Sequence, residues 1–238
     1  MDGNGRWARL RGLPRIAGHR EGVNRVRDIV RAAGELGIKC LTLYAFSCEN
    51  WKRPKEEVDE LMKLLERFLR TQAKEIRKQG LRLRTIGDIA ALPEKVRSLL
   101  EKTIAESAGN EKGTLVLALN YGSRQEVIAA VRAYALAVRE GREDLDALDW
   151  DRFSRHLYTG DLPDPDLIIR TSGELRVSNF LLLQGAYAEY CFVQKSWPDF
   201  GPADLREAIE AYNARERRFG MTGEQICNGT GQNTRLIS

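Results

Sequence analysis

Residues 2–8 combine a carboxylate with a glycine-flanked turn that ends on an arginine, reading Asp-Gly-Asn-Gly-Arg-Trp-Ala. Glycine lets backbone N–H groups approach an anion closely, and an arginine guanidinium donates a forked pair of hydrogen bonds to phosphate oxygens. Asp2 supplies the hard oxygen ligand that Mg²⁺ prefers. The segment therefore predicts a diphosphate and metal site, whereas a glycine-rich terminus taken alone also fits a flexible turn.

Two further segments place arginine among small and polar residues. Residues 47–54 read Ser-Cys-Glu-Asn-Trp-Lys-Arg-Pro, and residues 170–180 read Arg-Thr-Ser-Gly-Glu-Leu-Arg-Val-Ser-Asn-Phe. Arginines also crowd the start of the chain, at positions 6, 9, 11, 15 and 20. This arrangement suits anionic groups, although any one of these arginines taken singly also fits a solvated face. The net charge of +4 is too small to argue for nucleic acid.

The elements that must position these segments alternate between helix and strand. Apolar residues recur at helical spacing over 20–36, 55–79, 93–107, 123–140 and 202–219, which predicts five helices. Apolar stretches over 38–46, 81–87, 114–120, 166–170 and 189–193 predict strands. Residues 141–165 are acidic and contain prolines, which indicates an irregular excursion with one short helix. The pattern predicts a single α/β domain with a mainly parallel central sheet flanked by helices.

Composition limits the class of protein. The chain has 238 residues, of which 42% are hydrophobic and 30% charged, as in a globular protein with one sizeable core. It contains neither an apolar run long enough to span a bilayer nor a signal peptide. The four cysteines have neither metal-ligand nor disulfide-framework spacing, so we expect a cytoplasmic protein.

Several motifs in order, including Gly12–His19 and the Trp-Pro-Asp-Phe of residues 197–200, resemble the cis-prenyltransferases, and most closely the bacterial undecaprenyl diphosphate synthases. The resemblance runs from Met1 to about Gly220. It implies a transferase of isoprenoid biosynthesis in which an apolar tunnel between helices and sheet holds the growing prenyl chain. We expect the catalytic domain over 1–220 and a disordered tail over 221–238. The family carries an apolar strand directly ahead of the Asp-Gly-Asn-Gly segment, so we expect this sequence to lack the first strand of the domain.

The resemblance assigns residues to two substrates. Asp2 would bind Mg²⁺ and help the allylic diphosphate to leave. Its phosphates would be held by Gly3, Asn4, Gly5, Arg6, Arg15 and His19, with Trp7 packed beside them. For isopentenyl diphosphate, the resemblance implies binding by Arg170, Arg176 and Ser178, with Glu189 as a second Mg²⁺ ligand. Val177 is a further expected substrate-binding residue. The junction between the two substrates would be lined by Ser47, Asn50, Trp51 and Arg53. Cys48 and Glu49 are further expected substrate-binding residues.

Asn50 has a part in the proton step in the account that the resemblance implies. A neutral amide is a poor base, so Asn50 is alternatively expected to orient a water or a diphosphate oxygen that takes the proton. We place Asp2 and Asn50 in the catalytic set.

The predicted function is Mg²⁺-dependent condensation of isopentenyl diphosphate with an allylic diphosphate, farnesyl diphosphate, to a long-chain Z-polyprenyl diphosphate such as undecaprenyl diphosphate. In bacteria this product becomes the lipid carrier for cell-wall sugars. The resemblance also implies a homodimer that contacts the inner face of the membrane transiently to release product. The alternative is a non-catalytic homologue that binds phosphate as a regulatory or partner subunit.

Other motifs are weaker. Residues 3–8 satisfy the Gly-x-Gly-x-x-Ala pattern of dinucleotide sites, but no strand precedes them in this sequence. His156 lies in the acidic excursion and is expected to be a surface residue. Asn228-Gly229-Thr230 is a glycosylation sequon that we expect to stay unmodified.

Overall fold

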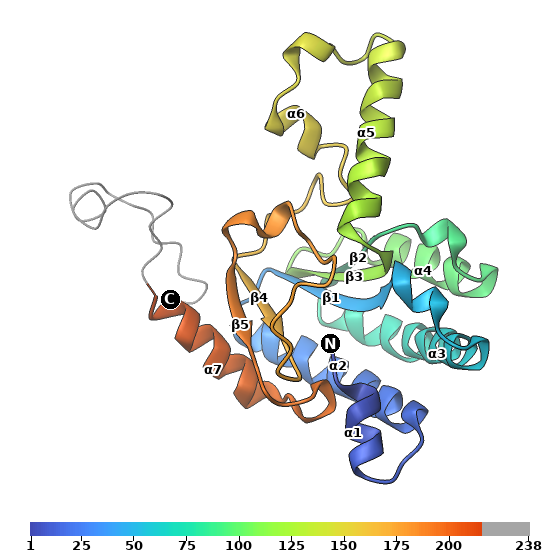
Figure 1. Ribbon diagram of the computed structural model, residues 1–238, viewed down its shortest axis with the longest axis vertical. Helices are drawn as coiled ribbons and strands as arrows, with labels where there is room; N and C mark the ends of the chain where they lie inside the picture. The colour runs from blue at the N-terminus through green and yellow to red at the C-terminus, as the bar shows by residue number, and fades with distance from the viewer. Residues whose placement is uncertain (216–238) are drawn as a thin grey trace.

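The computed structural model describes residues 1–215 of the chain. Its strands form two parallel sheets, and the strands of both sheets alternate with helices along the chain (Figure 1). The α/β fold class with a parallel sheet flanked by helices is therefore confirmed. The expected tail over 221–238 lies outside the described residues.

The larger sheet has the order β1-β3-β2, with β1 at Cys40–Ser47, β2 at Leu81–Ile86 and β3 at Gly113–Tyr121. β3 is the central strand and is buried from Leu115 to Leu119, as expected for a strand covered on both faces. The register pairs Leu43 of β1 with Leu117, and Leu83 of β2 with Leu115. This sheet carries the main core.

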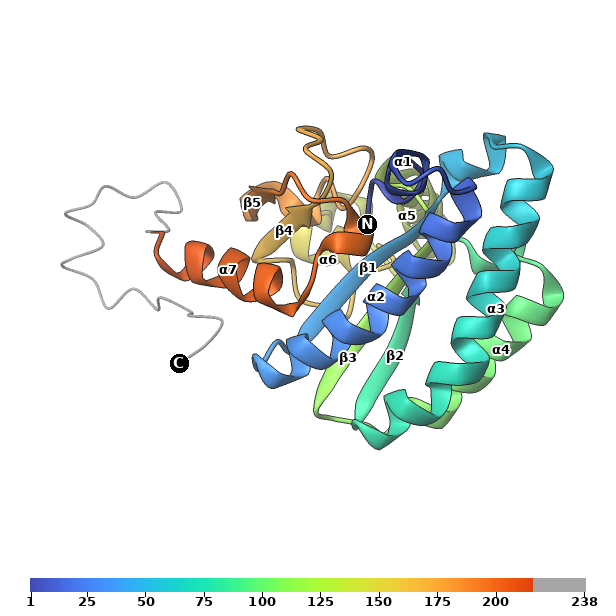
Figure 2. The same cartoon turned by 90° about the horizontal axis from the view of Figure 1, so that it is seen from below.

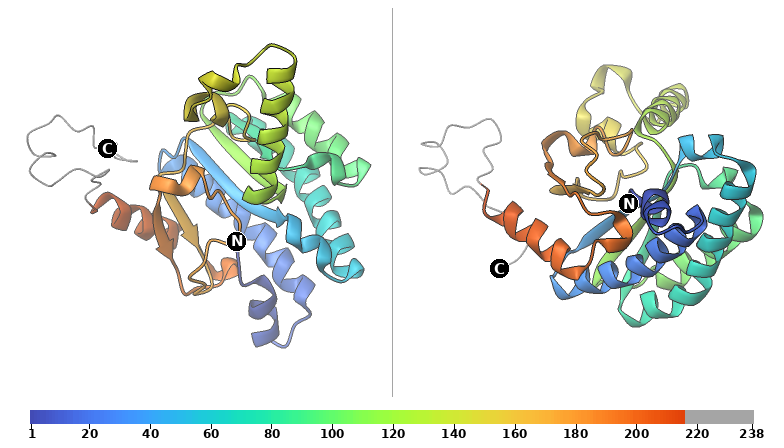
Figure 3. Two further views of the ribbon diagram at one scale, coloured as in Figure 1. Left: turned by 45° about the horizontal axis from the view of Figure 1, so that its top comes forward. Right: turned by 60° about the horizontal axis from the view of Figure 1, so that its bottom comes forward.

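Helices pack on one face of the larger sheet, and loop residues including Tyr158, Leu162, Phe180 and Leu181 pack on the other. α2 (Arg15–Glu35) and α3 (Lys55–Lys78) lie along one face, with α4 (Glu94–Ser107) packed against α3 and β2 (Figure 2). α5 (Ser123–Arg139) and the short α6 (Trp150–Ser154) lie on the other side (Figure 3). Each long helix has one apolar stripe, and the α3 stripe buries Val58, Met62, Phe68, Leu69 and Ile76.

The smaller sheet contains β4 (Leu167–Arg170) and β5 (Glu189–Phe192), which pair in parallel. α7 (Pro202–Asn213) packs beside it, and the expected end of this helix at Phe219 lies outside the described residues. β1 and β4 are each an edge strand of their own sheet. The expectation of a missing first strand stays a prediction.

The first residues of the chain differ from the sequence-based expectation. A turn was expected over residues 2–8, but Gly3 alone has a turn conformation there, with a φ of 95°. The helix α1 follows directly, over Asn4–Leu10. α2 begins at Arg15 rather than Arg20, because Pro14 fits the position ahead of a first helical turn. α1 packs closely on α2 at Gly18, where an added Cβ would collide with the carbonyl oxygen of Asn4. Glycine at this position is therefore a packing requirement.

Within residues 1–215, no helix is long and apolar enough to cross a membrane.

Candidate active site

Two cavities lie beside β1. The larger, of about 950 Å³, separates β1 from β4 and is apolar inside, with a charged rim at the carboxyl ends of both strands. The smaller, of about 110 Å³, lies between α2, α3 and the larger sheet. The rim of the larger cavity brings together nine of the predicted site residues: Asp2, Ser47, Glu49, Asn50, Arg53, Arg170, Arg176, Val177 and Ser178. Asn4 and His19 line the smaller cavity.

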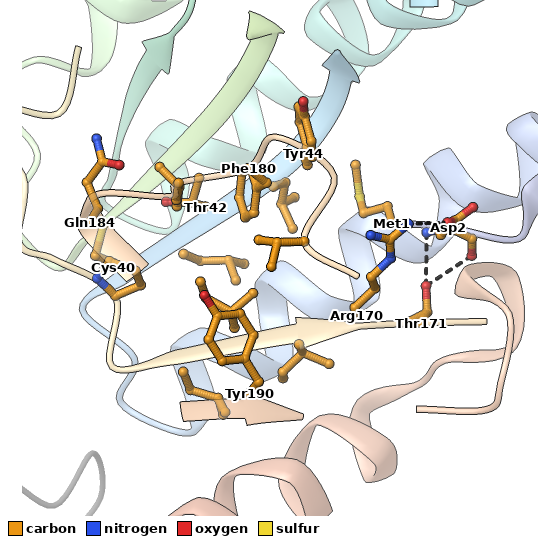
Figure 4. A pocket seen from close by; sticks show the side chains of 18 of the residues that line it. Met1, Asp2, Cys40, Thr42, Tyr44, Arg170, Thr171, Phe180, Gln184 and Tyr190 are labelled. Carbon is orange, nitrogen blue, oxygen red and sulfur yellow. Dashed lines mark hydrogen bonds and ion pairs between the residues drawn. The ribbon is translucent and has the colours of Figure 1, made fainter. Parts of the chain in front are cut away.

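Asp2 is held both through its side chain and through its main chain (Figure 4). One carboxylate oxygen accepts a hydrogen bond from the Gly3 N–H at 2.7 Å, and the other accepts one from Arg170 Nη2 at 3.1 Å. Burial acts to raise the pKa of this carboxyl, but the hydrogen bonds from Arg170 and Gly3 outweigh burial and hold that pKa below its ordinary value. Asp2 is therefore charged at neutral pH and remains partly exposed to solvent.

Arg170 ends β4 and points along the rim toward Asp2. Besides Asp2, its guanidinium donates to Ser178 Oγ at 2.8 Å and to the carbonyl oxygen of Arg176. Arg6 and Arg176 both pair with Glu174, and Arg6 Nη2 lies 2.5 Å from its carboxylate. We call Asp2, Arg6, Arg170, Glu174 and Arg176 the loop cluster, because most of its cations stand at or beside the loop that follows β4.

A second set of cations surrounds Glu57 in the first turn of α3. One Glu57 oxygen lies 3.2 Å from Arg15 Nη2, 3.1 Å from Arg53 Nη1 and 3.5 Å from His19 Nε2. We call Arg15, His19, Arg53 and Glu57 the helix cluster. Burial acts to raise the pKa of Glu57, but the hydrogen bond and charge of Arg15 and the charge of Arg53 outweigh it, so the pKa lies below its ordinary value.

His19 has the opposite balance. Burial, followed by the charge of Arg53, lowers the pKa of the His19 imidazole below 6.5 although Glu57 acts to raise it. His19 is therefore neutral at physiological pH. At 3.5 Å its Nε2 atom is too far from Glu57 for a good hydrogen bond, and it is buried without a partner in the described residues. A neutral imidazole with one free nitrogen at a cationic site is suited to hydrogen bonding with an anion's oxygen.

Comparison with known proteins agrees with this geometry. A family model described as putative undecaprenyl diphosphate synthase matches residues 1–220. Isoprenyl transferase from Agrobacterium fabrum is 54% identical over 226 residues, covering 95% of this chain and 92% of the relative. Isoprenyl transferase from Clostridium perfringens is 49% identical over 92% of this chain and 87% of its own length.

Solved structures give the same result. Lavandulyl diphosphate synthase from Lavandula x intermedia, in complex with dimethylallyl diphosphate, superposes with a TM-score of 0.90 at 40% identity, covering 92% of this chain and 95% of that one. A probable undecaprenyl diphosphate synthase from Campylobacter jejuni has a TM-score of 0.74 at 34% identity, covering 84% of this chain and 92% of that one. The chain belongs to the undecaprenyl diphosphate synthase family of cis-prenyltransferases. It is a transferase of prenyl groups.

Asn50 of this prenyltransferase is engaged in a local hydrogen-bond pair. Its Oδ1 atom accepts from the Ser47 N–H at 3.1 Å, while the Ser47 side chain accepts from the Asn50 N–H. This capping box fixes the turn η1 (Cys48–Lys52) at the end of β1. The amide oxygen of Asn50 is thereby occupied, so the free function of this side chain is its N–H₂ group, a donor. The arrangement favours the orienting role over the role of a base.

Three aromatic or thiol residues of the predicted set line neither cavity. Trp7 Nε1 donates to Asp199 at 2.7 Å, and its ring lies under Arg11, whose Cζ is 4.2 Å from the ring centroid. Trp51 donates to Asn120 Oδ1 at 2.8 Å. Burial and a hydrogen bond to Glu49 raise the pKa of the Cys48 thiol to about 11, so it is protonated at neutral pH. Contact of these side chains with substrate stays a prediction.

Glu189 lies at the other end of the smaller sheet from Asp2. It pairs in register with Leu167, three residues ahead of Arg170, which corresponds to roughly 10 Å along a strand. Its carboxylate pairs with Arg215 Nη1 at 2.7 Å. The structure does not bring Glu189 to Asp2, and within residues 1–215 no group of three potential ligands is arranged around a metal site. Asp2 alone still fits Mg²⁺, which is commonly held by one carboxylate together with substrate phosphates.

Three residues at the site were not assigned from the sequence. Glu57 follows Arg53 by four positions at the start of a helix, and this spacing is a recognisable ion-pair signal. Glu174 and Asn179 lie within residues 170–180, but neither their residue types nor their spacing indicated a role. Asn179 Nδ2 donates to Glu49 at 2.9 Å and to Gln125 at 3.1 Å, which ties the loop after β4 to the turn after β1.

Proposed function

We propose that this prenyltransferase condenses isopentenyl diphosphate with an allylic diphosphate, farnesyl diphosphate, in a Mg²⁺-dependent reaction. The product is a long-chain Z-polyprenyl diphosphate such as undecaprenyl diphosphate. The observation that carries the proposal is the convergence of Asp2, Arg170 and Asn50 on one cavity rim, at the carboxyl ends of strands from two sheets. A carboxylate and two arginine clusters match the diphosphate heads of the two substrates.

The reaction forms a carbon–carbon bond between the terminal alkene carbon of isopentenyl diphosphate and the allylic carbon. The allylic C–O bond breaks, its electron pair leaves with the diphosphate, and a proton is lost from isopentenyl diphosphate so that a new double bond forms. Bound Mg²⁺ would neutralise charge on the departing diphosphate. The chain must hold two anionic heads next to each other, and this requires many fixed cations.

We assign the helix cluster to the allylic diphosphate and the loop cluster to isopentenyl diphosphate. Arg15 and Arg53 would turn from Glu57 to the allylic phosphates, and neutral His19 would donate one hydrogen bond there. Arg170 already aligns Ser178 for the second diphosphate. The N–H₂ group of Asn50 would orient the oxygen that takes the proton, and a leaving diphosphate oxygen is a suitable acceptor.

We assign the growing chain to the smaller cavity. Its lining comes from α2, α3, β1 and β3, and it includes Asn4 and His19 of the allylic site.

The family membership also supports a homodimer in the cytoplasm with transient membrane contact at product release, serving the lipid carrier of the cell wall. α5 exposes about half of the Ile128 and Val131 side chains, which supplies an apolar surface for a second copy. Sedimentation of the full chain, compared with an Ile128→Glu/Val131→Glu variant, tests the dimer.

The deciding experiment for the activity is incorporation of radiolabelled isopentenyl diphosphate with farnesyl diphosphate and Mg²⁺, followed by separation of the products by chain length. The chain and its Asp2→Ala variant are compared. We expect Mg²⁺-dependent long products from the chain and a loss of at least a hundredfold in the variant, as when a principal electrostatic group is removed. Absence of incorporation together with binding of a starter analogue would favour the non-catalytic partner subunit.

A further inference from the structure

The backbone of Asp2 is held by one side chain, the hydroxyl of Thr171. The Asp2 N–H donates to Thr171 Oγ1 at 2.9 Å, and the same hydroxyl donates to the Asp2 carbonyl oxygen at 3.0 Å (Figure 4). Thr171 is 2% exposed. One buried hydroxyl therefore both accepts from the N–H and donates to the C=O of the same residue, which lies 169 positions away in sequence.

This pairing resembles what a neighbouring strand supplies in a sheet, where one residue both donates to and accepts from another. Asp2 belongs to no strand of the described residues. Its carbonyl oxygen has one further partner, the Trp197 N–H at 2.8 Å, and the Trp197 indole is anchored on Gly22 O at 2.8 Å. The Asp2 N–H has Thr171 as its partner, so loss of the hydroxyl leaves a partly buried donor unpaired.

Thr171 directly follows Arg170, whose guanidinium holds the Asp2 carboxylate. Two consecutive residues at the end of β4 thus control Asp2, one through the side chain and the other through the main chain. The carboxylate itself is 40% exposed and is held by the Gly3 N–H and by Arg170. Its position also depends on where its backbone is held, and Thr171 is the side chain that holds the backbone.

We infer that Thr171 is a positioning residue for Asp2: its hydroxyl sets the location of the carboxylate that binds metal and faces the departing diphosphate. The inference rests on the proposed function, in which Asp2 has that task. It predicts that the hydroxyl governs turnover and metal affinity, with little effect on substrate affinity, because the arginines that bind the diphosphates keep their own contacts.

Thr171→Val tests the inference, since it keeps the shape of the side chain and removes both hydrogen bonds. We expect kcat to fall by about tenfold to a hundredfold, the cost typical of a displacement near 1 Å at a reacting centre. The KM values for both diphosphates stay within about twofold, and half-maximal activity requires several-fold more Mg²⁺. Thr171→Ser keeps the hydroxyl and restores kcat to within about threefold of the unaltered chain.

Thr103→Val is the matched control. Thr103 is equally buried, at 3%, and its hydroxyl donates to Leu99 O at 2.7 Å inside α4, away from the rim. Urea unfolding of both Val variants compares their stabilities. If stability alone were responsible, Thr103→Val would lower kcat as much as Thr171→Val for the same loss of stability.

Calorimetric titration of Mg²⁺ into each protein with inorganic pyrophosphate present gives a readout that is independent of turnover. Weaker Mg²⁺ binding in Thr171→Val, restored in Thr171→Ser, supports the inference even if the unaltered chain is inactive, an outcome that would count against the proposed function alone. Unchanged kcat and Mg²⁺ affinity in a folded Thr171→Val protein overturn the inference while leaving the proposed function in place.

Discussion

Both cationic clusters pair arginines with carboxylates, but the two are supported differently. In the helix cluster, Arg15 and His19 lie on α2 and Glu57 on α3, on ordinary helical backbone. In the loop cluster, the segment after β4 contains Ser172, Ser178 and Asn179 with φ values of 78°, 51° and 61°. Non-glycine residues in this region cost about 1–2 kcal/mol each and persist only where surrounding contacts fix them. Helices organise the helix cluster in advance, and side-chain hydrogen bonds organise the loop cluster.

The comparison therefore predicts unequal sensitivity to single changes. A side chain on a helix keeps its place when one partner is lost. A loop residue that depends on two or three hydrogen bonds does not.

The largest expected difference between the two clusters is in the kinetic loss that an arginine-to-lysine change causes in each. Arg170 is 16% exposed and contacts Asp2, Ser178 and the Arg176 carbonyl, and lysine cannot reproduce this fork. Arg15 is 62% exposed and contacts Glu57. We expect Arg170→Lys to lower kcat/KM for isopentenyl diphosphate about a hundredfold, the equivalent of about 3 kcal/mol. Arg15→Lys should raise KM for the allylic substrate by less than about tenfold.

Steady-state kinetics with each substrate varied in turn measures both effects. Equal losses in the two variants would show that the support of the clusters does not matter.

Asn179 offers a test of what holds the loop. Its side chain contacts Glu49, Gln125 and the Arg124 N–H, and its φ of 61° is unfavourable for most residues. Asn179→Ala loses the contacts and places at this φ a residue that tolerates it less well than asparagine, whereas Asn179→Gly loses the contacts and removes the strain. We expect KM for isopentenyl diphosphate to rise about tenfold in both variants, the equivalent of one lost charge-assisted hydrogen bond.

The allylic KM, measured in the same assays, should change by less than about twofold, because the helix cluster does not touch Asn179. Recovery of normal kinetics in Asn179→Gly alone would assign the effect to backbone conformation rather than to the contacts.

The same difference in support explains which parts of the site the sequence could predict. The helices and strands follow from apolar periodicity, so α3 and β3 were placed almost to the residue. Arg170 and Ser47 were placed at strand ends because the apolar stretches stop there. Local patterns therefore predict the elements and the side chains at their ends.

Contacts between distant segments have no local pattern. The bond from Thr171 to Asp2 spans 169 residues, and the bond from Asn179 to Glu49 spans 130. Residues 2–8 were expected to form a turn because glycines flank Asn4, whereas Gly3 is the residue ahead of α1 and tertiary packing on α2 stabilises this helix. The split between two sheets likewise depends on which strand edges meet, and hydropathy carries no information on that.

Glu57 and Glu174 allow the two clusters to be compared from the acidic side, because each pairs with arginines of its cluster. A diphosphate carries more charge than one carboxylate, so it should displace either glutamate. Glu57→Gln keeps the shape of the side chain and removes its charge. We expect inorganic pyrophosphate to bind about threefold more tightly, consistent with the modest energy of partly exposed ion pairs.

Glu174→Gln is the matched variant in the loop cluster, and calorimetric titration measures both. For Glu174→Gln we expect a smaller gain in pyrophosphate affinity, because losing the Glu174 charge also removes the ion pair that anchors the loop on Arg6. Weaker pyrophosphate binding in Glu57→Gln would mean that the carboxylate orients the helix cluster rather than competing for it.

The smallest expected effect is the contribution of His19 to the pH dependence of stability, because only one imidazole group contributes to it. The unfolded chain takes up a proton on His19 near pH 6.5, whereas in the folded protein burial and Arg53 lower the imidazole pKa, so protonation waits for a lower pH. Between these two pKa values the unfolded state binds more protons, so the free energy of unfolding falls as the pH drops through that window and is unaffected by His19 above it. Urea unfolding of the chain and of His19→Asn between pH 5 and pH 7.5 measures the contribution. We expect the difference in stability between the two proteins to shift in favour of His19→Asn as the pH falls below 6.5, and a pH-independent difference would mean that Glu57 compensates fully for burial in holding the proton.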